Sequence, residues 1–242
     1  MKQISTPEGD GVCPVCSGHI SALYTEPTRE KIICQFCRAT GRDAAIANLI
    51  ANLLGKIDIP LTKLNINKQI YIGNLSGSNN LSNVISQKFS YINTYYHQEP
   101  KFDLLNPDAK YESKFDILIN SEVLEHIVGD TIKALQGALF SIKPGGWMIF
   151  SVPFINNGPD IEHYPGLVSY EVIPSKNTKS AKLYFDDGRV DIDTKAVFHG
   201  GGGSTLEIRL YNRTRVIFEL LKAGFESISI HDENRPSIGV QW

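Results

Sequence analysis

The sequence predicts an α/β protein built on a mostly parallel sheet and preceded by a small metal-binding segment. Residues 115–154 follow the pattern strand, loop, helix, turn, strand, in which two short apolar runs flank an amphipathic helix. Two apolar strands joined by a helix form a βαβ unit, whose strands are parallel and bind ligands at their carboxyl ends. Four cysteines in two Cys-x-x-Cys pairs, all before residue 40, predict the metal-binding segment.

Length and composition are those of one α/β unit with a small appendage. The chain has 242 residues, of which 42% are hydrophobic, and its formal net charge is -2. A charge so close to zero gives no sign of a surface for polyanions over the whole chain. Because the sequence lacks a run of 18 apolar residues and begins with a polar stretch, we expect no membrane span and a cytoplasmic location.

The first element is a candidate zinc ribbon in residues 1–42. The spacing C-x2-C-x17-C-x2-C is typical of a four-thiolate zinc site, whose ligands would be Cys13, Cys16, Cys34 and Cys37. The alternatives are two redox motifs, which normally occur singly beside a βαβ unit, and two disulfides, which a cytoplasmic setting disfavours. Four thiolates leave no open position on the metal, so we expect a structural Zn²⁺ that supplies much of the folding free energy of this segment.

Charge discriminates between a structural ribbon and one that binds nucleic acid. Residues 1–45 contain five basic and five acidic side chains. A neutral balance lacks the positive surface that phosphate binding requires. We therefore expect the ribbon to be structural or to shape the acceptor site, and nucleic acid is the disfavoured partner.

An amphipathic helix and a linker are expected in residues 43–60. The apolar residues recur at i, i+3, i+4, i+7 and i+8, and Gly55 ends the helix. This helix should pack the ribbon onto the main unit, which is expected to occupy residues 61–242.

Residues 69–77, Gln-Ile-Tyr-Ile-Gly-Asn-Leu-Ser-Gly, are predicted to form a strand that ends in a tight loop. Gly73 and Gly77 would let backbone N–H groups approach a ligand and would open the next helix. A plain strand-to-helix turn is an equal interpretation. The next strand, residues 91–95, ends at Tyr95, whose phenol can hydrogen-bond a hydroxyl group.

The stretch 115–154 carries a resemblance to a known family. A strand beginning Phe-Asp is followed by Ser-Glu-Val-Leu-Glu-His, a helix, Lys-Pro-Gly-Gly, and a strand ending Ser-Val-Pro. In this order and spacing the stretch resembles class I S-adenosylmethionine-dependent methyltransferases, specifically the type 11 group. The resemblance implies a Rossmann-like, seven-stranded, mostly parallel sheet and S-adenosylmethionine as the cofactor. A Rossmann-like crossover that binds another ligand is the alternative.

The resemblance also implies a set of cofactor-binding residues. The family's glycine pattern is met at its outer positions, but Tyr71 replaces the acidic residue and Leu75 the central glycine. Tyr95 stands where the family has its ribose-binding acid, with Tyr96, His97 and Glu99 as substitutes. Asp103 stands where the family places its adenine-contacting acid, although a solvated loop aspartate is an equal interpretation. The expected set is Gly73, Asn74, Gly77, Tyr95, Asp103, Leu104, Asn120, Ser121 and Glu122.

Two regions are expected to face the methyl acceptor. His126, in the loop at residues 121–126, and His199 are the candidates for a general base, which is needed only if the acceptor is protonated. The alternative for His126 is a backbone hydrogen bond that shapes the loop. The insertion at residues 155–200 contains scattered aromatic residues and a predicted hairpin at Asp186-Asp187-Gly188. The glycines at 200–203 predict either a hinge or close backbone approach, and a flexible surface loop is the alternative.

The chain is predicted to close with a helix and a strand. Asn212 or Thr214 would cap the helix, Gly224 would stop it, and residues 225–230 would form the strand.

These patterns predict an S-adenosylmethionine-dependent methyltransferase that acts on an oxygen or nitrogen of a small-molecule or glycan-type acceptor, without assigning an oligomeric state. The ribbon, the segment Tyr-Tyr-His-Gln-Glu-Pro at 95–100 and the block from His199 to Glu207 together resemble bacterial methyltransferases with an N-terminal zinc ribbon, several of which are linked to glycan or surface-polymer pathways, and this resemblance implies the glycan-type acceptor. One alternative is an rRNA or other nucleic-acid methyltransferase, which a basic face would support, formed by Arg38, Arg42, Arg213 and Arg215. The other is a non-catalytic binding module on a degenerate methyltransferase fold, which the altered glycine loop suggests.

Overall fold

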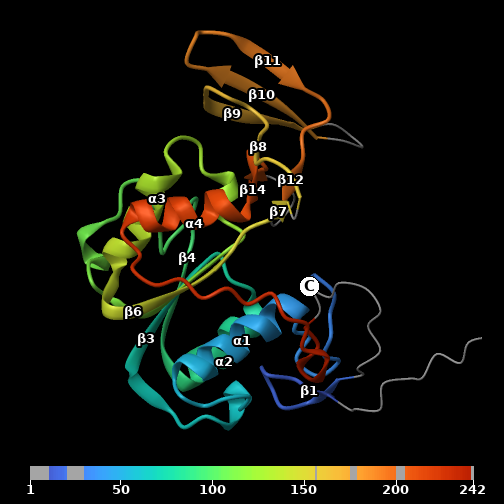
Figure 1. Cartoon of the computed structure of the whole chain (residues 1–242), viewed down its shortest axis with the longest axis vertical. Coiled ribbons are helices and arrows are strands. Elements are labelled where there is room, and N and C mark those ends of the chain that lie inside the picture. The colour runs from blue at the N-terminus through green and yellow to red at the C-terminus, as the bar shows by residue number, and fades with distance from the viewer. Residues whose placement is uncertain (1–10, 21–29, 156, 175–178, 200–204, 241–242) are drawn as a thin grey trace, which may run out of the picture.

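The centre of the computed structural model, which describes residues 11–20, 30–155, 157–174, 179–199 and 205–240, is a parallel sheet with the strand order β4-β3-β5-β6 (Figure 1). Its strands are β3 (Asn67–Leu75), β4 (Phe89–Thr94), β5 (Phe115–Ser121) and β6 (Ile142–Ser151). Helix α2 (Asn79–Lys88) connects β3 to β4, and α3 (Thr131–Ser141) connects β5 to β6. The predicted βαβ unit is therefore confirmed.

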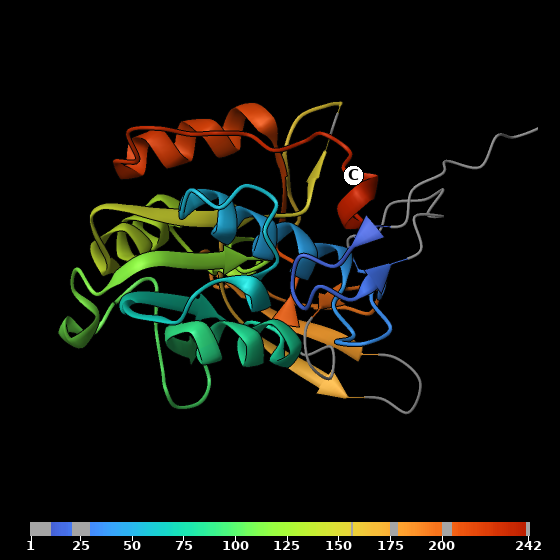
Figure 2. The ribbon, with the colours of Figure 1, turned by 90° about the horizontal axis from the view of Figure 1, so that it is seen from below.

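Helices cover both faces of this sheet (Figures 1 and 2). Helices α1 (Gly41–Leu53) and α2 lie on one face, and α3 and α4 (Arg213–Ala223) lie on the other. Successive side chains of a strand point to opposite faces. Ile117 and Ile119 of β5 accordingly join the core with α1 and α2, whereas Leu118 joins the core with α3 and α4. With both faces covered, the edge where the strands end is left to the loops.

Capping residues determine where the helices begin and end. Thr40 and Asp43 form a capping box at the start of α1. Asp130 accepts hydrogen bonds from the first turn of α3, and Asn212 caps α4 as predicted. Gly224, with φ of 107°, ends α4 in the left-handed conformation that favours glycine. The predicted helices are confirmed.

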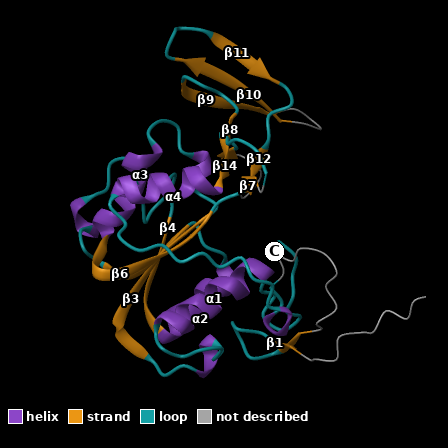
Figure 3. Cartoon of the chain, viewed as in Figure 1, coloured by secondary structure: helices purple, strands orange, loops and turns teal. Residues whose placement is uncertain are grey.

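The remaining strands form smaller sheets, which Figure 3 separates from the helices by colour. Strands β9 (Leu167–Pro174), β10 (Lys179–Phe185) and β11 (Val190–Asp193) form an antiparallel sheet at the top of Figure 1. The turn between β10 and β11 confirms the predicted hairpin, and Gly188 supplies its positive φ of 83°. Strand β14 (Arg209–Asn212) lies between β7 (Phe154–Ile155) and β8 (Ile161–Glu162), while β12 (Phe198–His199) pairs with β13 (Thr205–Leu206).

The predicted seven-stranded sheet is wrong for the described residues, because their central sheet has four strands and the later strands pair elsewhere. The predicted strand at 225–230 is also wrong, since this segment is not assigned to a strand. Phe225 and Ile228 pack against the core beside α4, so their apolar side chains are covered without strand pairing. The glycines at 200–203 lie outside the described residues. Within the described part of the chain, every helix is too short or too polar to cross a membrane.

The candidate zinc ribbon packs against α1 and the C-terminal segment (Figures 1 and 2). Strand β1 (Gly11–Val12) pairs with β2 (His19–Ile20), and the 3-10 helix η4 (Pro236–Ile238) packs against β1. The Arg235 guanidinium donates to Asn48 Oδ1 of α1 and to Asp58 Oδ1, each at 2.6 Å. These contacts hold the end of the chain against the start of the main unit.

Candidate active site and metal centre

The candidate active site lies at the carboxyl edge of the central sheet. Loops that follow parallel strands gather at this edge, which is where such folds bind ligands. Gly73 lies within β3, opposite Ile92 of β4 and Leu118 of β5. Ser121 ends β5 opposite Ser151 of β6. The structure therefore brings the ends of the predicted cofactor-binding strands to one edge.

Asn93 closes the loop that follows β3. Its Oδ1 accepts a hydrogen bond from the Gly77 N–H at 2.8 Å, and its Nδ2 donates to the Gly77 carbonyl at 3.0 Å. The same Nδ2 donates to the Tyr95 hydroxyl at 2.9 Å. Asn93 thus links two of the predicted residues, Gly77 and Tyr95. Sequence reasoning missed Asn93, although it lies two residues before Tyr95 and so on the same face of the chain.

Packing explains both glycines of this loop. A Cβ at Gly77 would lie 1.9 Å from Asn74 Nδ2, and a Cβ at Gly73 would lie 2.8 Å from the Phe115 ring. Asn74 is only 2% exposed, so its side chain has little freedom to move aside. Both positions require glycine in this fold, whatever ligand the loop meets.

Backbone hydrogen bonds bring residues 102–104 beside the end of β4. The Phe102 N–H donates to the Tyr95 carbonyl at 2.8 Å. Asp103 is half-buried, and its Oδ1 accepts from the N–H two residues later at 2.9 Å. Leu104 is buried against α3, where its carbonyl leaves no room for a side chain at Gly137. The predicted residues Tyr95, Asp103 and Leu104 therefore lie along one stretch of the edge.

Strand β5 ends in a cluster of amide, hydroxyl and carboxylate groups. The Ser121 and Ser151 hydroxyls lie 2.7 Å apart, and Ser151 donates to Glu122 Oε1 at 2.9 Å. Asn120 is fully buried, and among the described residues its Oδ1 has no hydrogen-bond partner. An unsatisfied buried acceptor costs roughly 1–3 kcal/mol, so this end of β5 carries a local cost in stability.

Three histidines gather around Glu207. His199 Nε2 lies 2.8 Å from Glu207 Oε2, and His163 Nε2 lies 3.4 Å from Glu207 Oε1. The ring centroids of His126 and His199 are 5.8 Å apart. Glu207 is only 7% exposed, so its carboxylate is held mainly by these imidazoles. The structure thus brings the two predicted histidines together, and it adds His163 and Glu207, which lie 44 positions apart in the sequence just after β8 and β13 and so leave no local sequence signal.

A backbone hydrogen bond fixes the tautomer of His126. Its Nδ1 lies 2.8 Å from the Leu206 carbonyl, which can only accept, so Nδ1 carries the hydrogen and Nε2 keeps its lone pair. Burial lowers the pKa of His126, and this effect outweighs the opposite effect of the bond to Leu206. The imidazole is therefore neutral at pH 7 and able to accept a proton at Nε2.

The lowered pKa of His126 predicts that stability falls in acid. The unfolded chain, with its histidine pKa near 6.5, binds more protons than the folded chain. Stability is therefore complete above that pKa and is lost as the pH falls through the lower folded-state pKa. In His126→Asn an amide can keep the bond to Leu206 without titrating, so the urea midpoint should fall less between about pH 7 and about pH 5.5 than in the wild type. The control is His231→Asn, on the exposed C-terminal segment. Equal pH profiles for His126→Asn and the wild type would contradict the prediction.

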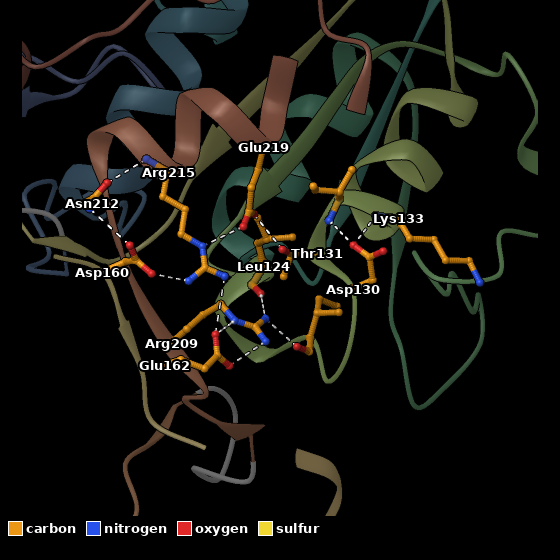
Figure 4. Close-up of polar contacts among 12 residues, drawn as sticks. Leu124, Asp130, Thr131, Lys133, Asp160, Glu162, Arg209, Asn212, Arg215 and Glu219 are labelled. Atoms are coloured by element: carbon orange, nitrogen blue, oxygen red, sulfur yellow. Dashed lines mark hydrogen bonds and ion pairs between the residues drawn. The ribbon is translucent and has the colours of Figure 1, made fainter. Parts of the chain in front are cut away.

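A buried arginine anchors the loop that contains His126 (Figure 4). Arg209 is 4% exposed, and its Nε and Nη2 donate to the two carboxylate oxygens of Glu162 at 2.9 and 3.0 Å. Its Nη1 donates to the Ile127 carbonyl at 2.7 Å. The N–H of Ile208 donates to the Glu125 carbonyl at 2.9 Å. Ile208 and Arg209, at the start of β14, therefore hold the loop on both sides of His126.

A second arginine extends this network to α4 (Figure 4). Arg215 donates to Asp160 Oδ2 at 2.5 Å and to Glu219 Oε1 at 2.8 Å. Thr131, at the start of α3, donates to the other oxygen of Glu219 at 2.8 Å. A cavity of about 270 Å³ borders both arginines, and its lining includes Val128, Glu162 and Tyr164.

The four cysteines fit a structural zinc site. Their sulfur atoms all lie within 4.8 Å of one another, with Cys13 Sγ 3.7 Å from Cys37 Sγ and Cys16 Sγ 3.6 Å from Cys34 Sγ. A tetrahedral site with Zn–S bonds of about 2.3 Å separates its sulfurs by about 3.8 Å. Burial raises the pKa of Cys37 to about 12 and also raises that of Cys13, so these thiolates need a cation to offset their desolvation.

No family model and no curated protein matches this sequence. Solved structures do match it. The glycopeptide N-methyltransferase MtfA complexed with sinefungin is 12% identical, with a TM-score of 0.42 over 82% of this chain and 88% of that chain. The DszA carbon methyltransferase is 14% identical, with a TM-score of 0.36 over 47% of this chain and 35% of that chain. An S-adenosylmethionine-dependent methyltransferase from Mesorhizobium loti is 12% identical, with a TM-score of 0.30 over 67% of this chain and 76% of that chain.

These likenesses are distant. The chain spans 35% of the length of the DszA and CurJ carbon methyltransferases, and every TM-score above is below 0.5. They carry no argument about reaction or acceptor, which must come from the residues of this chain. The three structures named above are nonetheless methyltransferases, the class that the sequence resembles, and the four cysteines of this chain form one cluster, as a zinc ribbon requires.

Proposed function

We propose that this protein is an S-adenosylmethionine-dependent methyltransferase that acts on an oxygen or nitrogen atom of a small-molecule or glycan-type acceptor. The observation that carries the proposal is the cluster of polar side chains at the carboxyl end of β5, where the Ser121 and Ser151 hydroxyls lie 2.7 Å apart and Ser151 donates to Glu122 Oε1. Parallel sheets bind ligands at this edge, and the partly exposed Ser121 hydroxyl and Glu122 carboxylate could hydrogen-bond the carboxylate and the amine of a bound cofactor.

The proposed cofactor site is formed by the loops that follow β3, β4 and β5. The Tyr95 phenol, held by Asn93, would meet the ribose hydroxyls in place of the carboxylate that the family has at this position. Asp103 would meet the adenine, and the cluster at the end of β5 would meet the methionine part. The proposed set is Gly73, Asn74, Gly77, Tyr95, Asp103, Leu104, Asn120, Ser121 and Glu122.

The protein's part in the reaction would be to orient the acceptor, exclude water and accept a proton where the acceptor has one. S-adenosylmethionine, when bound, supplies an electrophilic methyl group on a sulfonium, so alignment provides most of the catalysis. His126 keeps a lone pair at Nε2 and is the first candidate for the base. His199, hydrogen-bonded to Glu207, is the second.

A polar acceptor fits the insertion that follows β6. A cavity of about 370 Å³ lies beside β10 and β11, lined in part by Tyr164, Phe185, Arg189, Asp191 and Asp193. The Arg189 guanidinium covers the Phe185 ring at 3.8 Å, so the charged side chains of this lining, which can hydrogen-bond hydroxyl groups, would meet the acceptor. This lining supports a glycan-type acceptor over an apolar one.

The basic face that a nucleic-acid methyltransferase would need is largely neutralised. Arg213 pairs with Asp232 at 3.1 Å, Arg42 pairs with Glu30 at 2.7 Å, and Arg215 lies between acidic side chains. Paired arginines contribute little net positive charge for phosphate binding. The non-catalytic binding module remains the second candidate, because Asn93 already occupies the Gly77 N–H that a cofactor loop would offer to its ligand.

Calorimetric titration of the zinc-loaded protein with S-adenosylmethionine and S-adenosylhomocysteine tests the proposal. We expect micromolar binding in the wild type and an affinity at least about tenfold lower in Gly77→Val, because its Cβ would displace Asn74 from the loop. The matched control is Gln87→Val, which places the same side chain on the exposed side of α2, outside the loop. If the folded wild type binds neither ligand at millimolar concentration, the binding module becomes the better assignment.

A further inference from the structure

One metal-binding turn contacts the chain just before β3. The other leads to a contact with the chain just after β3. In the turn at 13–16, the Pro14 carbonyl accepts from the Leu61 N–H at 2.7 Å, and the Val15 carbonyl accepts from the Thr62 N–H at 3.2 Å. Leu61 and Thr62 belong to the 3-10 helix η1 (Leu61–Lys63), which precedes β3. The turn at 34–37 leads within three residues to Thr40, the cap of α1.

Asp43 connects this cap to the loop after β3. Its Oδ2 accepts from the Thr40 N–H at 3.0 Å, and its Oδ1 accepts from the Ser78 hydroxyl at 2.7 Å. Ser78 directly follows Gly77 and caps α2. Asp43 is 5% exposed whereas Ser78 is exposed, so this charge-assisted bond lies at the boundary between core and solvent. A second bond runs in parallel, from Asn80 Nδ2 to the Arg38 carbonyl at 3.2 Å.

We propose that Asp43 and Ser78 are positioning residues for the proposed cofactor loop, through which the metal-binding turns set its shape. The inference rests on the proposed function, because it concerns the binding of S-adenosylmethionine at residues 73–77. Asn93 holds Gly77 from the side of β4, and Asp43 holds the next residue from the side of the ribbon. The loop is thus fixed at its end by two independent side chains.

The metal has a defined part in this arrangement. One Zn²⁺ bound to both Cys-x-x-Cys turns would hold the contact before β3 and the contact after it in a fixed relation. Loss of the metal would release both turns and leave the loop anchored from the side of β4, by Asn93 and by the Ser76 N–H bond to the Thr94 carbonyl at 2.8 Å. The ribbon would therefore shape the cofactor site through Asp43 and Ser78. It would make no contact with the acceptor.

Two substitutions of similar size at Ser78 separate this link from the helix cap. Asparagine and aspartate are both good N-caps. Asparagine can donate its amide to the Asp43 carboxylate, whereas aspartate places a second carboxylate against it. In zinc-loaded protein we expect Ser78→Asn to bind S-adenosylhomocysteine within about threefold of the wild type and Ser78→Asp to bind it at least about tenfold more weakly, both with full zinc content. The charge control is Asn79→Asp, whose added carboxylate lies on the next residue of α2 and should leave the affinity near that of the wild type.

A second measurement tests the same coupling by following the release of the metal instead of the binding of the ligand. Coupling between two sites is reciprocal, so the ligand should also make the metal harder to remove. We expect S-adenosylhomocysteine to slow zinc loss to a chromogenic chelator in the wild type and in Ser78→Asn, and to have no such effect in Ser78→Asp. Equal affinities and equal protection in the two Ser78 variants would overturn the inference alone. Absence of binding to the wild type would overturn the proposed function and the inference with it.

Discussion

Substitution of Cys34 by serine is expected to abolish stable zinc binding and to unfold the ribbon. The alcohol has nearly the size of the thiol, but it is a poor zinc ligand, and Cys34 is fully buried. Structural zinc supplies an apparent 10–16 kcal/mol or so in zinc-finger peptides, which is as large as the entire stability of an ordinary domain, about 5–15 kcal/mol. Metal analysis after dialysis should fall from about one zinc per chain to a small fraction of that.

The loss should extend beyond the ribbon. Cys13 and Cys34 belong to the same buried cluster as Ile50 of α1 and Ile72 of β3. Urea unfolding of Cys34→Ser should therefore show a lower midpoint and an early transition of the ribbon with α1. The matched control is His19→Asn, a substitution of the exposed ribbon residue in β2, which should retain both zinc and midpoint. A serine variant with full zinc content and the wild-type midpoint would exclude the four-cysteine site.

The parts of the fold that sequence analysis predicted depend on local signals. The stripe of apolar residues in α1 and the stop signal at Gly224 lie within single helices, and the apolar run at residues 117–119 lies within one strand. Each can be identified without knowing what packs against it. The seven-stranded sheet was inferred from resemblance instead. It is wrong for the described residues because β14 pairs with β7 and β8, a choice that depends on contacts between distant segments.

The candidate site likewise has parts that could be predicted from the sequence and parts that could not. Asn120 and Ser121 could be placed at the carboxyl edge from the strand pattern alone, because the ends of parallel strands share that edge. The bonds that shape the site could not be predicted. Asn93 contacts Gly77 across the β3–β4 crossover, and Glu207 contacts His163 between separate small sheets. Such pairs follow from tertiary packing, which residue spacing does not encode.

Substitution of Arg209 by alanine is expected to destabilise the protein by about 3 kcal/mol, the lower end of the cost of removing one partner of a buried ion pair, because Glu162 is 28% exposed and keeps Arg215 at 3.6 Å. The variant leaves Glu162 without its bidentate partner and the Ile127 carbonyl without its donor. Lysine keeps the charge but cannot reproduce the fork, so Arg209→Lys should recover only part of the loss. Urea denaturation measures both variants.

Arg213→Ala is the matched control, because it removes an arginine from an ion pair that is exposed instead of buried. Arg213 and its partner Asp232 have 60% and 54% of their side chains exposed, and such surface pairs contribute about 0–1 kcal/mol. The NMR signals of the His126 imidazole should shift in Arg209→Ala and stay in place in Arg213→Ala, since Arg209 bonds the carbonyl directly after His126. If the two variants lose equal stability and leave His126 unchanged, then Arg209 does not hold the loop. The position of the candidate base would in that case depend on the Leu206 carbonyl and on the bond from the Ile208 N–H to the Glu125 carbonyl.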